Sequence, residues 1–370
     1  MAYSLDLCDA PITCHAWNKD MSMLAICPNT CDLLIYNIKD RKAFDLAYTL
    51  NEHTQVISSV DWHPETNKIV TCSHDRNAYV WTLIEDKKIW KKDLVVLKLN
   101  RAATYVRWSP DGKKFIVGTG TNKIRFCEYQ EEHHWWQSFN IKYQKPTPQP
   151  TTLCCEFFPC GDYIVSTSTT RHCSILATRD ELAKPTKTGP DFIIDKFDSQ
   201  GWNNSCAVSP QGNWVAFTSQ DSFIRFIHRS EISFSGKTEE EKPKKTININ
   251  GLPLLSIQFL GENTLVGAGY DCQPRLFYLN GEQWEDLGLI DLPDIREASG
   301  PSNKGGMAGK LAAFGGKPAP TTTENQPIHN NILLGLRIQK NTFSICANDG
   351  KVSIWPYEVI QKHFADKKLF

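Results

Sequence analysis

Short runs of small and apolar residues recur along the whole chain, and each run is followed by polar turn residues. Examples are KIVTCS, KFIVGT, YIVSTS, WVAFTS and TLVGAG. An apolar anchor precedes each run, and in the clearest copies it leads into a proline turn, as in WHP and WSPDG. A second segment with alternating apolar and polar residues follows the turn. Runs of this length between turn residues predict β-strands rather than helices.

This order of elements occurs seven times. The anchors are Trp17, Trp62, Trp108, Phe157, Val208, Phe259 and Ile338, and the turns lie at Thr30, Asp75, Thr121, Thr170, Asp221, Asp271 and Asn348-Asp349. Successive turns lie 45 to 51 residues apart, except for a last interval of 78. A period of about 40–45 residues is typical of a four-stranded propeller blade. The pattern predicts an all-β, seven-bladed WD40-type β-propeller with an insertion of 30-odd residues between blades six and seven.

The repeat also sets the expected organisation of the chain. Residues 1–370 form one domain, and the blades are expected at approximately 8–40, 53–85, 99–130, 149–180, 200–230, 250–280 and 328–357. The segment Tyr3 to Leu7 is predicted to pair as an outer strand beside the last blade, because a ring without a free edge resists aggregation. Residues 358–370 are predicted to form a short helical tail docked on an edge.

Blade two carries polar residues in positions that predict a buried hydrogen-bond network. The predicted tetrad is His53, Ser73, Asp75 and Trp81, with Thr71 as the alternative hydroxyl. A turn aspartate can bind the histidine, which reaches the tryptophan through the hydroxyl. A His-Ser-Asp set also suggests a protease, but the same register recurs in other blades with Thr or Asn in its place. We therefore interpret the set as structural rather than catalytic.

Charge and composition narrow the possible functions. Lys plus Arg and Asp plus Glu both number 41, so no net field attracts nucleic acid or an anionic membrane. No apolar stretch is long enough to span a membrane, and no secretion signal begins the chain. Thirteen cysteines, an odd number, then favour buried free thiols in a cytoplasmic protein. Their spacing lacks a paired C-x-x-C, so no metal site is predicted.

The phosphate-loop candidate fails as well. In GGMAGKL (residues 305–311) the first glycine is one residue too close to the Gly-Lys pair, and leucine stands where Ser or Thr is required. No cofactor, no catalytic residue and no enzymatic activity are therefore predicted. A propeller hydrolase would need inward carboxylates or a metal set around the channel, and the sequence indicates neither.

The insertion, residues 294–327, is rich in Gly, Pro, Ser and Thr and contains one apolar island. Met307, Leu311 and Phe314 follow the i, i+4, i+7 spacing of one helix face, and Lys310 adds positive charge. A helix this short is marginal alone in water, which favours an anchor that binds in a partner's groove. The alternative is a loop with a chance apolar stripe.

The cluster HHWW (residues 133–136) has two interpretations. Its aromatic side chains either pack between blades at the outer edge or form an exposed contact patch for a partner. The sequence does not separate the two.

Several segments resemble one family along essentially the whole chain. PITCHAWN, IVTCSHDRNAYVW, NRAATYVRWSP, LPLLS and AGYDC, with the Trp135-Trp136 pair, resemble subunit 1, the β-propeller subunit, of the actin-related protein 2/3 complex. An insertion occurs at the same junction in that family. The resemblance implies a cytoplasmic structural subunit, associated with the actin cytoskeleton, that supports nucleation of branched actin filaments.

The resemblance also implies partners. These are the other subunits of the complex, the actin filament and nucleation-promoting factors, with the insertion helix (Met307, Lys310, Leu311 and Phe314) contacting actin or the promoting factors. Bound adenosine triphosphate would belong to the actin-related subunits. The alternative function is a generic WD40 scaffold or adaptor, such as the substrate receptor of a ubiquitin ligase.

Overall fold

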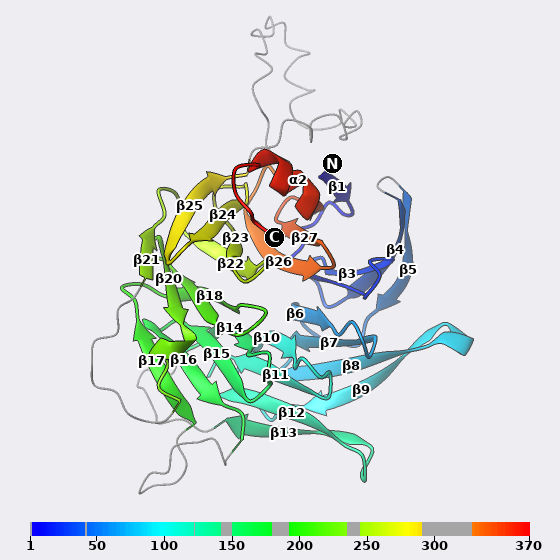
Figure 1. Ribbon diagram of the computed structural model, residues 1–370. Helices are drawn as coiled ribbons and strands as arrows, with labels where there is room; N and C mark the ends of the chain where they lie inside the picture. Colours follow the sequence, from blue (N-terminus) through cyan, green and yellow to red (C-terminus); the bar gives the residue numbers. More distant parts are fainter. Residues whose placement is uncertain are drawn as a thin grey trace, which may run out of the picture.

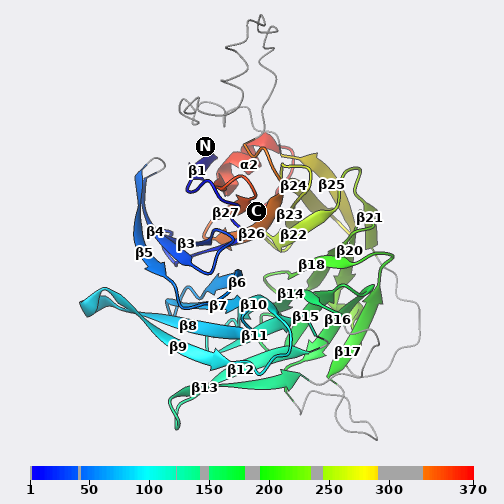
Figure 2. The same cartoon turned by 180° about the vertical axis from the view of Figure 1, so that it is seen from behind.

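The computed structural model describes residues 2–40, 43–121, 123–141, 150–179, 192–234, 245–290 and 328–370. Seven four-stranded antiparallel sheets are arranged in a ring (Figures 1 and 2). Within each sheet, neighbouring strands are also consecutive in the sequence, apart from the sheet that closes the ring. The predicted seven-bladed propeller is confirmed.

The strands of each blade are given from the centre of the ring outward. Blade one has β2 (Cys14–Trp17), β3 (Met23–Cys27), β4 (Leu33–Asp40) and β5 (Ala43–Leu50). Blade two has β6 (Ile57–Trp62), β7 (Lys68–Ser73), β8 (Asn77–Ile84) and β9 (Ile89–Val96). Blade three has β10 (Ala103–Trp108), β11 (Lys114–Thr119), β12 (Ile124–Gln130) and β13 (Trp135–Ile141). Blade four has β14 (Thr152–Phe157), β15 (Tyr163–Ser168), β16 (His172–Ala177) and β17 (Ile193–Asp198).

The remaining blades follow the same order. Blade five has β18 (Asn203–Val208), β19 (Trp214–Ser219), β20 (Phe223–His228) and β21 (Lys245–Asn248). Blade six has β22 (Leu254–Phe259), β23 (Thr264–Gly269), β24 (Arg275–Asn280) and β25 (Gln283–Leu289). Blade seven has β26 (Leu333–Gln339), β27 (Thr342–Ala347), β28 (Lys351–Pro356) and β1 (Tyr3–Asp6). Two short 3-10 helices, η1 (Glu85–Lys87) and η3 (Arg229–Glu231), follow β8 and β20, and the helix α2 (Tyr357–His363) follows β28.

The ring closes as predicted, because the first strand completes the last sheet. β1 pairs antiparallel with β28, in a register that places Tyr3 opposite Ile354 and Asp6 opposite Lys351. Figure 1 shows the blue N-terminal strand beside the red C-terminal elements. The blade that joins the two ends of the chain is therefore held by backbone hydrogen bonds between them.

The predicted blade ranges were too short. In six blades the fourth strand lies beyond the predicted end of the blade. Blade two, for example, was predicted to end at residue 85, but its fourth strand β9 begins at Ile89. The reason is burial: the outer strand of a blade packs on one side only, so it lacks the continuous apolar run that marks the inner strands. Strand β9, for example, has exposed positions along most of its length.

The C-terminal tail was only partly predicted. The helix α2 ends at His363, and residues 364–370 are not helical. The side chain of Gln361 donates to Lys367 O at 2.6 Å and accepts from the N–H of Leu369 at 3.0 Å. These two bonds turn the chain back over the helix and bury Leu369 against blades six and seven.

The apolar core lies between neighbouring blades. The second strand of each blade is buried on both faces, as in β7, where Ile69 and Val70 are inaccessible. One cluster of buried side chains joins blades one and two, and others continue around the ring to a cluster that joins blades seven and one. No described helix is long and apolar enough to cross a membrane.

Candidate functional site

A chain of buried hydrogen bonds runs through blade two. His53 Nδ1 lies 2.7 Å from Asp75 Oδ2, and His53 Nε2 lies 2.8 Å from Thr71 Oγ1. The indole N–H of Trp81 donates to the same hydroxyl at 3.0 Å. Because Asp75 only accepts, Nδ1 carries the proton and the hydroxyl of Thr71 donates to Nε2. Burial lowers the pKa of His53, which keeps the ring neutral.

The hydroxyl of the tetrad comes from Thr71 and not from Ser73, so the choice of Ser73 was wrong. Ser73 is the last residue of β7, and its hydroxyl donates to Gln55 O at 2.9 Å and accepts from the N–H of Asp75 at 3.1 Å. It therefore stabilises the turn. Thr71 lies two residues deeper in the strand, within reach of both rings.

Blade seven contains a second tetrad, which the sequence reasoning missed. His329 Nδ1 lies 3.1 Å from Asp349 Oδ2, and Nε2 lies 2.7 Å from Ser353 Oγ. The indole N–H of Trp355 donates to that hydroxyl at 2.9 Å. The signal was present, because His329 precedes its anchor by nine residues, as His53 does in blade two. Here the hydroxyl lies on β28 instead of on the second strand.

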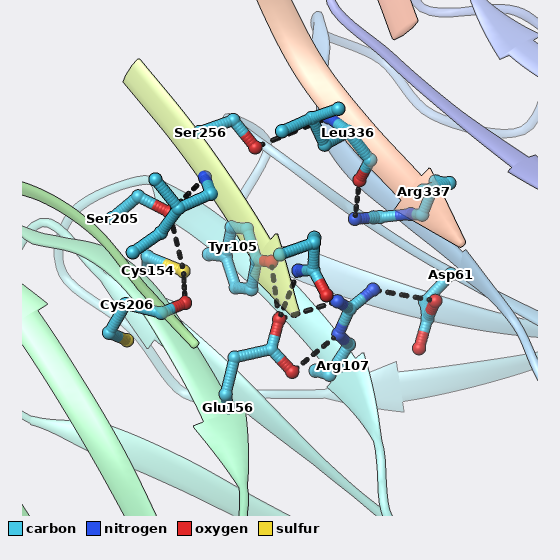
Figure 3. A network of polar contacts seen from close by, with 12 residues as sticks. Asp61, Tyr105, Arg107, Cys154, Glu156, Ser205, Cys206, Ser256, Leu336 and Arg337 are labelled. Carbon is cyan, nitrogen blue, oxygen red and sulfur yellow. Dashed lines mark hydrogen bonds and ion pairs between the residues drawn. The ribbon is translucent and has the colours of Figure 1, made fainter. Parts of the chain in front are cut away.

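The central channel holds an ion network that connects four blades (Figure 3). Arg107 on β10 binds Glu156 on β14 through Nε at 2.9 Å and through Nη2 at 2.5 Å, and Asp61 on β6 through Nη1 at 3.3 Å. Glu156 also accepts from Tyr105 Oη at 3.4 Å and from Gln258 Nε2 at 3.1 Å. A cavity of about 320 Å³ borders this network.

Four of these channel residues, Asp61, Arg107, Glu156 and Gln258, share one position in the repeat that the sequence reasoning overlooked. Each stands immediately before the anchor of its blade, on the strand nearest the channel. The residues at this position are Ala16, Asp61, Arg107, Glu156, Ala207, Gln258 and Arg337. The expectation that no carboxylate points inward was therefore wrong for Asp61 and Glu156.

The hydrogen bonds of Asp61 and Glu156 favour a structural role for these carboxylates over a role in proton transfer. Burial alone would lower the pKa of Arg107, but the charges of Glu156 and Asp61 raise it well above the usual value. Asp61 Oδ2 also accepts from the N–H of Trp108 at 2.8 Å. All four carboxylate oxygens are thus engaged by groups of the same network, which fixes the neighbouring blades relative to one another. No group of three or more potential metal ligands occurs within the described part of the chain.

Nine of the thirteen cysteines are buried as free thiols between the strands. Burial raises the pKa of Cys72 to about 12, so this thiol stays protonated at neutral pH. Such cysteines act as small apolar residues in the core.

The two tryptophans of HHWW differ in burial: Trp136 packs against aromatic rings of its own blade, and the contact of Trp135 with a partner stays a prediction. Trp136 is 5% exposed and packs against Trp108, Phe115 and Tyr129, with ring centroids 5.1 to 5.7 Å apart. Trp135, the neighbouring residue on the same strand, is 55% exposed. Alternation along β13 explains the difference, because successive side chains point to opposite faces of a sheet. Met307, Lys310, Leu311 and Phe314 lie outside the described residues.

The ring of four-stranded blades, with His–hydroxyl–Asp–Trp networks in two of them, defines a WD-repeat β-propeller. The profile of the family described as "WD domain, G-beta repeat" matches residues 44–82. The fold is similar to that of the Cps50 (Swd1) β-propeller domain of Myceliophteria thermophila, with a TM-score of 0.65 at 12% identity, over 95% of this chain and 97% of that one.

Sequence relatives identify the family. The chain is 34% identical to actin-related protein 2/3 complex subunit 1B-A of Xenopus laevis over 100% of both proteins. It is 32% identical to subunit 1A-A of the same organism, over 97% of both, and 30% identical to subunit 1B of Arabidopsis thaliana, over 96% of this chain and 97% of the relative. The chain belongs to the family of actin-related protein 2/3 complex subunit 1.

Proposed function

We propose that this chain is a non-catalytic structural subunit of the actin-related protein 2/3 complex, in which it supports the nucleation of branched actin filaments. The observation that carries the proposal is its similarity, along its whole length, to relatives that bear the name of subunit 1 of that complex. A closed ring also suits a scaffold, since its faces and outer edges offer several separate surfaces to partners. The expected location is the cytoplasm, at the actin cytoskeleton.

The channel chemistry supports a scaffold rather than an enzyme. A general acid or base needs a carboxyl group that is free to exchange a proton with a substrate. Here Glu156 and Asp61 are both tied to a guanidinium that remains charged, and the ion network links blades two, three, four and six. Its role is to hold the ring rigid, so that surfaces on different blades keep a fixed spacing.

The insertion between β25 and β26 is the proposed contact with actin or with a nucleation-promoting factor. It joins Leu289 at the end of blade six to Leu333 at the start of blade seven. Met307, Leu311 and Phe314 would form the apolar face of a short helix that binds in a groove, and Lys310 would add charge at its border.

Co-purification tests membership of the complex. Tagged full-length chain is expressed in its native cytoplasm, and the proteins that bind to it are identified by mass spectrometry. We expect two actin-related proteins and several smaller subunits in constant proportion. Recovery of ubiquitin-ligase components without actin-related proteins would show the alternative function, a WD40 adaptor, and would refute the proposal.

A pair of double variants tests the role of the insertion. Leu311→Asp with Phe314→Asp places two charges on the apolar face, whereas Gly309→Asp with Ala312→Asp places two charges on the opposite side of the same helix. Both complexes should assemble normally. The first variant should lower the rate of branched nucleation in a pyrene-actin assay, and the second should retain it. Equal rates in the two variants would show that the island is a chance stripe.

A further inference from the structure

An arginine occupies the same place in blades three, five and six. Arg125, Arg225 and Arg275 each stand four residues after the turn residue of their blade, near the start of the third strand. All three are buried, with 7%, 7% and 6% of their surface exposed. A buried guanidinium needs a counter-charge, because removing it from water without one costs several kilocalories per mole.

In blade five the counter-charge is supplied by the turn, and in blade six it comes mainly from Asp286 on β25. Arg225 Nη2 lies 2.6 Å from Asp221 Oδ2, and Arg225 Nη1 donates to Ser219 Oγ at 2.8 Å. In blade six Arg275 Nη1 lies 2.6 Å from Asp286 Oδ2, and Arg275 Nη2 lies 3.9 Å from Asp271 Oδ2. Each of these two arginines therefore has a carboxylate within 2.6 Å, and the turn aspartate of D-x-x-x-R is hydrogen-bonded to the arginine in blade five and lies 3.9 Å from it in blade six.

Blade three has the arginine without the aspartate. Thr121 stands at the turn position, and its hydroxyl lies 2.8 Å from Thr119 Oγ1. In blade five the equivalent contact is made by the carboxylate of Asp221, which accepts from the hydroxyl of Ser219. Arg125 Nη2 donates to the backbone oxygen of Lys98 at 2.8 Å, and its buried Nε has no partner. No carboxylate among the described residues forms an ion pair with Arg125.

Three more cationic residues lie near Arg125 in the sequence or on the segment that its guanidinium contacts. Lys98, Arg101 and Lys123 are exposed in the segments beside it, and none of them forms an ion pair within the described ranges. Burial lowers the pKa of Arg125, as expected for a cation without a counter-ion. Exposed cations on the segments next to a buried cation add to its positive potential, which favours a multiply charged anion.

We propose that Arg125, together with Lys98, Arg101 and Lys123, forms an oxyanion site in blade three that binds a phosphate group where blades five and six carry a carboxylate. Two or more phosphate oxygens can accept from one guanidinium, which fits the unpaired edge of Arg125. The neighbouring lysines then compensate the second negative charge. The phosphate is either the free ion or the ester group of a small organic molecule, since both present the same oxygens.

Thermal unfolding of the full chain tests the site. Inorganic phosphate is titrated against sodium chloride at constant ionic strength. A bound anion raises the melting temperature along a saturating curve, and we expect a rise of about 2 °C. Thr121→Asp supplies a carboxylate at the position of Asp221, so this variant should melt higher than the wild type without phosphate and should lose the saturating response.

Blade four provides a matched control. Thr170 occupies the same turn position, and its hydroxyl lies 2.7 Å from Ser168 Oγ, but Ser174 stands where blade three has Arg125. Thr170→Asp should therefore not raise the melting temperature and should keep the phosphate response. This control also separates binding from the general stabilisation by phosphate salts, which does not saturate and affects every variant equally.

A second titration with glycerol 2-phosphate distinguishes the two sources. A response equal to that of inorganic phosphate indicates that the site accepts a phosphate ester, and a response to the inorganic ion alone indicates that it takes the free ion. The proposal is wrong if the wild type shows no saturating response to either probe, even where Thr121→Asp raises stability. It is equally wrong if Thr121→Asp responds to phosphate as the wild type does.

Discussion

Replacing Thr71 with valine removes one hydroxyl from the blade-two tetrad and keeps the shape of the side chain. Thr71 is fully buried, and its oxygen serves both His53 Nε2 at 2.8 Å and Trp81 Nε1 at 3.0 Å. The variant leaves an acceptor and a donor unsatisfied in the core, at about 1–3 kcal/mol each. The added methyl group recovers part of this loss. We therefore expect the free energy of unfolding to fall by about 2–4 kcal/mol.

Thr71→Ser is the matched control, because it keeps the hydroxyl and removes one methyl group, at about 1 kcal/mol. Both variants are compared with the wild type by thermal unfolding followed by circular dichroism. For a chain of this length each kilocalorie per mole shifts the melting temperature by about 1–1.5 °C, so Thr71→Val should melt about 2–6 °C lower. If valine is tolerated as well as serine, the hydrogen-bond chain contributes nothing measurable and the reasoning is refuted.

Three further outcomes follow from other parts of the ring. Arg107→Met should lower the free energy of unfolding by about 3–5 kcal/mol, because it leaves the charge of Glu156, whose side chain is only 12% exposed, without its arginine; a loss below about 1 kcal/mol in urea denaturation would contradict this. Trp136→Ser should destabilise the ring by about 3–5 kcal/mol, whereas Trp135→Ser on the same strand should change the melting temperature by less than about 1 °C. Burial, with a contribution from a nearby arginine charge, holds the pKa of His15 well below 6.5, so the unfolded chain binds this proton first as the pH falls. Stability should drop below about pH 6.5 by up to about 1.4 kcal/mol per pH unit, and His15→Gln should show a smaller drop between pH 7.5 and 5.5 in the same urea assay.

The number of blades and the closure of the ring could be predicted because they depend on local patterns. The three inner strands of a blade carry apolar runs set by burial, and the turns between them fix the period. The outer strands could not be placed in the same way, since β9 and β13 are half exposed and their composition resembles that of loops. Their positions depend on pairing with the third strand of the blade, and this pairing leaves no separate apolar run in the sequence.

The polar networks show a different limit. Glu156 lies 49 residues from Arg107 and Gln258 lies 102 residues from Glu156, so their contacts exist only once the blades are arranged around one channel. The common position before each anchor would have indicated that these side chains meet. The choice between Thr71 and Ser73 was harder, because both side chains point to the same face of β7. Only the positions of the His53 and Trp81 rings, which lie beside Thr71, distinguish the two hydroxyls.

The pairing of β1 with β28 also sets the order of events during synthesis. Tyr3–Asp6 leaves the ribosome first, and its partner strand Lys351–Pro356 follows almost 350 residues later. At about 5–20 residues per second, roughly 20–70 s separate the two. Six sheets can stack during that time while the arc remains open, with a bare strand at one end and an unpaired edge ready to capture a neighbouring nascent chain. Production of this protein should therefore depend on chaperones that shield β1 until β28 has been synthesised.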